Sequence, residues 1–124
     1  MGKYVDGFLI PIKPEKIDNY TEIAQAAGAI WKEHGALEYI EAVGDDLEIE
    51  GMVSFRKSAG TNHDETVIFA FIVYESKEDR DRINALVMED ARMKEMMSKM
   101  KPEGEEPFDY TRMAYGGFKP IVEL

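Results

Sequence analysis

The sequence predicts an α+β fold in which a four-stranded antiparallel sheet carries both of its main helices on one face. The main observation is the order of the segments. Apolar stretches typical of strands and stretches with apolar residues every three or four positions follow one another as strand, helix, strand, strand, helix, strand. The chain has 124 residues, of which 44% are apolar. This size and composition suit one domain, covering residues 1–124, with a substantial core.

Residues 3–12 form the first predicted strand, because they are aromatic and branched and a Lys-Pro-Glu-Lys segment closes them. Pro14 suits the first turn of the helix that follows. The apolar face of this helix is predicted to contain Ile17, Tyr20, Ile23, Ala24, Ala27, Ile30 and Trp31. We expect Trp31 to be buried in the core, with stacking on a ligand as the alternative.

The end of this helix decides how His34 and Glu38 are interpreted. The two residues are four positions apart and would be neighbours on one continuous helix. Gly35, however, is expected to adopt a left-handed conformation and to end the helix, so that residues 36–43 begin a strand at once. We therefore interpret His34 as a helix-end residue that the negative end of the helix dipole favours. A catalytic pair is the alternative.

The second half of the chain begins with the segment that the sequence describes least, residues 45–65. It is expected to be mostly loop, with a short strand at residues 52–55 as an alternative. Residues 66–74 are the clearest strand of the chain because they are nearly all apolar. Ser76 and Asp79 match a capping box at the start of a helix that extends to Asp90.

The remaining residues predict a short helix, a loop and a last strand. Asp90 is expected to cap the short helix, whose methionines share one face: Met93, Met96, Met97 and Met100. Residues 101–107 are rich in glycine, proline and acidic residues, which is typical of a loop. Residues 108–124 are predicted to be the last strand with a tail, and Gly116 and Gly117 indicate a bulge or a close approach.

The strand at residues 66–74 also predicts self-association. Val67, Phe69, Phe71 and Val73 point to one face, and the residues between them are apolar as well. Since both helices cover the same face, the other face would expose a large apolar patch. A second copy of the chain, packed sheet against sheet, would cover it. We therefore expect a homodimer.

Composition excludes several classes of function. The net charge is −10, so the chain would repel phosphates, and we expect no nucleic-acid partner. There is no cysteine, which excludes disulfides and thiolate chemistry. The chain has no signal-peptide layout and no apolar stretch of membrane-spanning length, so we expect no membrane partner and a cytoplasmic location. No motif or ligand spacing indicates a cofactor or a metal site, and His63 is expected in a solvated loop.

Arginines raise the question of buried charge. Arg112 falls in the predicted last strand, and a buried arginine needs a carboxylate, a carbonyl or a bound anion. We interpret it as part of an internal ion pair with Asp6 or Glu41, and an anion site is the alternative. Arg80 and Arg82 alternate with Asp79 and Asp81 on the second helix, which is typical of a solvated face.

Four segments, in order, resemble the YbaA-like family of small bacterial proteins: residues 4–12, 31–46, 64–90 and 113–118. This family is similar to the dimeric α+β barrel superfamily. The resemblance implies a ferredoxin-like monomer and a homodimer. It does not extend to the haem-degrading branch of that superfamily, because the first strand offers Asp6 in place of an asparagine and the second helix has no histidine.

Two hypotheses of function follow. The sequence contains no recognisable nucleophile–base pair, so it leaves open whether the protein is an enzyme. The first is a pocket between helices and sheet that binds or transforms a small apolar or aromatic molecule. Its predicted lining is Tyr4, Asp6, Trp31, His34, Phe71 and Arg112. The alternative is a non-catalytic structural or regulatory homodimer with a solid core. An open space with polar groups would favour the first hypothesis.

Overall fold

The computed structural model describes residues 2–99 and 108–124, which fold into a four-stranded antiparallel sheet and its helices. The elements in order are β1 (Tyr4–Ile12), η1 (Pro14–Lys16), α1 (Ile17–Glu33), β2 (Glu38–Val43), α2 (Phe55–Ala59), β3 (Thr66–Tyr74), α3 (Lys77–Glu89), α4 (Ala91–Ser98), η2 (Tyr110–Arg112) and β4 (Ala114–Phe118). The strands lie in the order β2-β3-β1-β4, and each neighbouring pair is antiparallel. This is the ferredoxin-like arrangement, and it confirms the predicted fold class. Met100 and the predicted loop at residues 101–107 lie outside the described residues.

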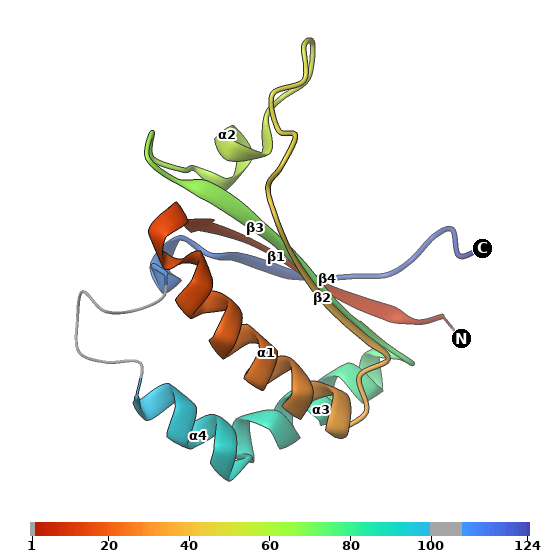
Figure 1. The fold of residues 1–124 in the computed structure, drawn as a ribbon. Helices are drawn as coiled ribbons and strands as arrows, with labels where there is room; N and C mark the ends of the chain where they lie inside the picture. The colour runs from red at the N-terminus through yellow and green to blue at the C-terminus, as the bar shows by residue number, and fades with distance from the viewer. Residues whose placement is uncertain (1, 100–107) are drawn as a thin grey trace.

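Helices α1, α3 and α4 cover one face of the sheet, while α2 lies on the other side near one end (Figure 1). The core forms where α1 and α3 pack on the strands, because apolar residues at helical spacing meet alternate strand residues. Its buried members are Ile10, Ile12, Tyr20, Ala24, Ile30, Ala36, Ile68, Ala70, Ile72, Tyr74, Ile83, Val87 and Met93.

The sheet face that points away from α1 stays partly uncovered. Ile40, Phe69 and Phe118 on this face are 42%, 47% and 61% exposed. Phe55 of α2 contacts Phe69, with ring centroids 6.0 Å apart, and covers only the end of the sheet. The outer face is therefore an apolar surface built from β2, β3 and β4.

The junction between α1 and β2 follows the sequence prediction. His34 directly follows the last helical residue, Glu33, as the C-cap, and Gly35 has a φ of +122°, in the left-handed region. The Leu37 amide donates to the Val73 carbonyl at 2.8 Å, so pairing with β3 starts just before β2. Gly35 therefore ends the helix, as predicted, and no continuous helix connects His34 with Glu38.

The segment before β3 differs from the alternative that placed a strand at residues 52–55. Ser54 instead caps α2, and its hydroxyl accepts from the Arg56 amide at 3.1 Å. Gly60, with a φ of +68°, ends the helix. The main-chain groups of this segment form hydrogen bonds within one short helix and with its Ser54 cap. No strand forms because these groups already have partners.

The last strand is shorter than predicted. Asp109 accepts from the Thr111 amide at 2.9 Å and caps η2, so Arg112 lies in this turn and not in a strand. Strand β4 then pairs with β1 in continuous register, without a bulge. A side chain at Gly117 would collide with the Tyr4 ring, which confirms the predicted close approach at this position.

Both caps in the second half are as predicted. The Ser76 hydroxyl accepts from the Asp79 amide at 3.0 Å at the start of α3. Asp90 accepts from the Arg92 amide at 2.9 Å and starts α4. None of the helices in residues 2–99 and 108–124 is long and apolar enough to cross a membrane.

Candidate functional site

A cavity of about 420 Å³ lies between the helices and the sheet. Its walls are mainly aromatic rings and methionines, supplied by α1, α3, α4, η2 and all four strands. The lining includes Phe8, Tyr20, Ile23, Ala27, Trp31, Tyr39, Glu41, Asn84, Met88, Met93, Met96, Met97, Phe108, Tyr110, Met113 and Tyr115, together with Asp6. This volume and composition are typical of small-molecule sites.

Three of the residues predicted from the sequence to line a pocket border this cavity: Asp6, Trp31 and Phe71. The Phe71 ring, however, contacts Phe69 on the outer face, with centroids 6.0 Å apart. Since side chains alternate along a strand, only the Phe71 main chain faces the cavity. The other three predicted residues, Tyr4, His34 and Arg112, do not line it.

Trp31 is partly buried and forms part of the cavity wall, whereas we predicted it to be buried in the core. Its indole contacts the Tyr39 ring, with centroids 6.0 Å apart. Its Nε1 donates to Asn84 Oδ1 at 3.0 Å. The indole thus lines the cavity, while its N–H group is held by a hydrogen bond to Asn84 of α3.

Asp6 is the centre of a buried polar network at one end of the cavity, and only 1% of it is exposed. Tyr74 and Tyr115 point their hydroxyls at Asp6 Oδ2, at 3.1 and 3.2 Å. Arg80 Nη1 donates to Asp6 Oδ1 at 3.2 Å, and Asn84 Nδ2 donates to Oδ2 at 3.4 Å. A buried carboxylate requires this kind of compensation.

The phenols of this network stay protonated. Burial, followed by the negative charge of Asp6, raises the pKa of Tyr74 and of Tyr115. The Tyr74 hydroxyl lies 3.1 Å from both Asp6 Oδ2 and Asn84 Oδ1, and its one proton serves either acceptor. The network can therefore rearrange its hydrogen bonds without changing its charge.

Arg80 was predicted on a solvated face, and this was wrong. Its side chain is largely buried, donates to the Tyr115 hydroxyl at 2.8 Å and lies over the Tyr4 ring, 4.9 Å from the centroid. Burial lowers the pKa of Arg80, but the combined effects of Asp6, Tyr115 and Asp81 outweigh burial and raise it. Arg80 falls on one helical stripe with Ile83 and Asn84, and this spacing is the signal that identifies it as inward.

Glu41 is the second carboxylate of the cavity, and it accepts hydrogen bonds from two tyrosine hydroxyls. We call this arrangement of Tyr20, Glu41 and Tyr39 the Glu41 bridge. The Tyr20 hydroxyl donates to Oε1 and the Tyr39 hydroxyl donates to Oε2. Burial, followed by the Glu41 charge, raises the pKa of both tyrosines, which therefore stay protonated donors. In the described part of the chain, Glu41 forms no ion pair with a lysine, arginine or histidine.

Gly28 in the middle of α1 allows the helix to reach this bridge. A Cβ atom at this position would lie 2.6 Å from Cδ1 of the Tyr39 ring, which is closer than real contacts allow. The ring thus occupies the place of a side chain on the helix. A second, more open cavity of about 500 Å³ lies between α1 and β2, and Tyr20, Tyr39 and Glu41 border both cavities.

His34 belongs to a different contact, outside the cavity. Its Nε2 lies 2.9 Å from Asp90 Oδ2, so that it connects the end of α1 with the cap of α4. Hydrogen bonds from Arg92 and then from His34 hold the pKa of Asp90 well below its usual range. The arrangement supports the interpretation of His34 as a helix-end residue.

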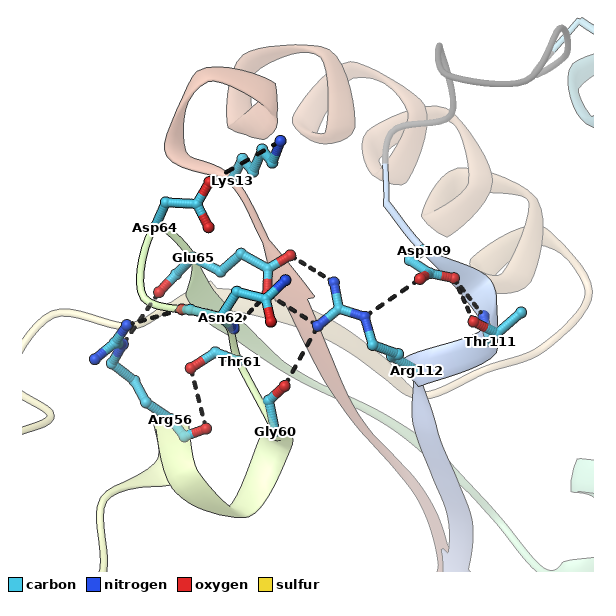
Figure 2. A network of polar contacts seen from close by, with 10 residues as sticks. All are labelled: Lys13, Arg56, Gly60, Thr61, Asn62, Asp64, Glu65, Asp109, Thr111 and Arg112. Atoms are coloured by element: carbon cyan, nitrogen blue, oxygen red, sulfur yellow. Dashed lines mark hydrogen bonds and ion pairs between the residues drawn. The ribbon is translucent and has the colours of Figure 1, made fainter.

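Arg112 forms the predicted kind of contact with a different partner. Figure 2 shows its guanidinium directed at Glu65, where Nη1 donates to Oε1 at 2.9 Å and Nη2 donates to Oε2 at 2.5 Å. Asp109 accepts from Nε at 3.2 Å. The prediction of Asp6 or Glu41 as partner was wrong, because η2 turns Arg112 toward the loop before β3.

The loop around Glu65 is held from both sides (Figure 2). Arg56 donates to the main-chain carbonyls of Asn62, His63 and Glu65 at 3.1 to 3.2 Å. The Asn62 amide donates to Glu65 Oε1 at 2.7 Å. These contacts hold the main chain of the loop in place, so we assign this network a structural role. Within residues 2–99 and 108–124, no three histidine or acidic side chains gather as metal ligands would.

Comparison with solved structures agrees with the topology. The chain is similar to a NIPSNAP family protein of unknown function from Agrobacterium tumefaciens, with a TM-score of 0.57 and 17% identity over 96% of this chain and 88% of the other. It is also similar to a dimeric ferredoxin-like protein from an uncultured marine organism, with a TM-score of 0.63 and 7% identity over the whole of both chains. At these identities the likeness shows the fold.

Comparison with other sequences identifies the family. A family model described as "Protein of unknown function (DUF1428)" matches residues 3–110. The chain is 40% identical over 121 residues to the uncharacterised protein YbaA of Escherichia coli strain K12. The alignment covers 98% of each chain. YbaA of Shigella flexneri matches to the same extent. The chain therefore belongs to the YbaA-like family, whose model is DUF1428.

Proposed function

We propose that this protein binds a small apolar or aromatic molecule in the cavity between its helices and its sheet. The observation that carries the proposal is the cavity of about 420 Å³, with aromatic and methionine walls and the Asp6 network at one end. Methionine walls adapt to the shape of an occupant, and the fixed polar groups orient it. The alternative of a homodimer with a solid core does not account for this open volume.

Filling the cavity tests this function. Ala27 lines the cavity, whereas Ala26 is exposed on the other side of the same helix. We expect Ala27→Phe to abolish the retention of compounds that co-purify with the protein, as measured by native mass spectrometry. Ala26→Phe is the matched control and should retain them. Equal retention in both variants, with unchanged circular dichroism, would contradict the proposal.

We also propose that two copies of the chain pack through their outer sheet faces. The support is the exposed apolar surface of Ile40, Phe69 and Phe118, which a second sheet would remove from water. Sedimentation equilibrium should give about twice the chain mass of 14.1 kDa. Phe69→Glu should shift the mass to that of one chain. Glu22→Gln, at an exposed position of α1 on the other side of the sheet, should leave it unchanged.

A further inference from the structure

We infer that the occupant of the cavity is an organic cation: a compound that carries a positively charged, alkylated nitrogen on an apolar or aromatic body. This inference rests on the proposed function and adds the charge and the chemical class of the ligand. It is carried by the charges of the lining, by their compensation, and by the arrangement of the aromatic rings.

The charged groups that line the cavity are all acidic. Among the described residues they are Asp6 and Glu41, and the lining contains no lysine, arginine or histidine. An anionic ligand would therefore meet only like charge in a site of low polarity, where repulsion is strong. A neutral ligand would not compensate the charge of the carboxylates.

The two carboxylates differ in how their charge is compensated. Asp6 has a cation at 3.2 Å, because Arg80 reaches it from outside the cavity. Within residues 2–99 and 108–124, the partners of Glu41 are the hydroxyls of Tyr20 and Tyr39, and these are neutral donors. A carboxylate that is partly removed from water without a counter-charge is costly, and a bound cation would relieve that cost.

Aromatic rings surround the space next to Glu41. Trp31 and Tyr39 form one wall, with centroids 6.0 Å apart. Tyr20 and Phe108 form another, with centroids 5.4 Å apart and an edge-to-face angle of 78°. Ring faces attract cations, and several rings around one volume are the arrangement that recognises alkylated ammonium groups. The net charge of −10 also attracts cations to the protein.

A pair of ligands of equal shape tests the inference on the unmodified protein. Benzyltrimethylammonium and its uncharged carbon isostere, neopentylbenzene, are titrated below the solubility limit of the hydrocarbon. Trp31 is the only tryptophan and lines the cavity, so its fluorescence reports occupancy. We expect the cation to bind about tenfold more tightly or better.

Two variants locate the charge that is responsible. Glu41→Gln removes the charge, accepts from one tyrosine hydroxyl through its oxygen and donates from its NH2 group to the oxygen of the other. It should weaken the binding of the cation by about tenfold and leave the binding of the hydrocarbon unchanged. Glu38→Gln is the matched control, since Glu38 is exposed on the same strand. It should leave both affinities unchanged.

The outcomes separate the two proposals. Equal or tighter binding of the hydrocarbon overturns the inference of a cation and leaves the proposed small-molecule function standing. An equal loss of cation affinity in both variants overturns the role of Glu41 and indicates a general effect of charge. A lack of response to either ligand overturns the proposed function and the inference together.

Discussion

Two buried carboxylates of this protein have similar partners and different surroundings. Asp6 is 1% exposed and Glu65 is 7% exposed, and each is paired with an arginine. Glu65 lies in a loop whose Asn62 amide donates to the Glu65 carboxylate and whose carbonyls accept from Arg56 (Figure 2). Asp6 is enclosed by side chains and borders an open cavity. An acid–arginine pair thus fixes structure in one place, and in the other it forms the polar end of a cavity.

The largest expected effect is at Asp6. Asp6→Asn removes the buried charge that faces Arg80, whose largely buried guanidinium then keeps only the exposed Asp81 as a counter-charge. We expect a loss of roughly 3–5 kcal/mol in the free energy of unfolding, measured with denaturant. Asp81→Asn is the control, because Asp81 is exposed and lies 3.0 Å from Arg80 Nε. A loss at Asp6 no larger than at Asp81 would remove the distinction between the two carboxylates.

A smaller loss is expected at Glu65. Glu65→Gln removes the charge opposite Arg112, but Arg112 keeps Asp109 and its side chain is 31% exposed. Water therefore compensates part of the change, and we expect a loss of roughly 1–3 kcal/mol in the free energy of unfolding. Cation binding in the cavity should not change, because Glu65 does not line it. Altered ligand affinity would show that the two networks are coupled.

The contribution of Glu65 should also depend on pH. Hydrogen bonds from Arg112 hold the pKa of this carboxyl below its usual value, although burial opposes the shift. A lowered pKa in the folded state stabilises the protein above the unfolded pKa of about 4.3, and this stabilisation is lost as the pH falls through the folded pKa. The stability difference between wild type and Glu65→Gln should therefore shrink below about pH 4 in denaturant titrations at stepwise lower pH.

The smallest effect is expected at the partly buried contact of His34 with Asp90. His34→Gln keeps a hydrogen-bonding group at the end of α1 and should change the melting temperature little. Gly35→Ala should cost more, about 1–3 kcal/mol, because alanine is strained at a φ of +122° and its Cβ would lie 3.3 Å from Ile83. A reversed ranking, with loss of ligand in His34→Gln, would assign His34 to the site.

Local signals in the sequence predicted most of the fold. The apolar run of β3, the Ser76 cap and the left-handed Gly35 each depend on neighbouring residues, and each is found in the structure. The partner of Arg112 depends on η2, which a single cap at Asp109 creates before the last strand. Propensity over a window of apolar residues does not detect a turn of this length.

The site was predicted less well for a related reason. Asp6 and Trp31 were predicted to line a pocket and border the cavity, because strand and helix periodicity places both inward. Arg80 was assigned to solvent from its charged neighbours, although its spacing to Asn84 indicates the inner stripe of α3. The bridge at Glu41 joins α1 with β2, and no local pattern pairs residues that are far apart in the chain.

The missing side chain at Gly28 has a consequence for how this family can diverge. The Tyr39 ring occupies the volume that any larger residue at position 28 would need. A methyl group on the helix and a ring on the strand therefore exclude each other, so that neither position can change alone without cost. Relatives with alanine or serine at position 28 are expected to carry a smaller residue at position 39. In those relatives the two phenols on Glu41 would be reduced to one.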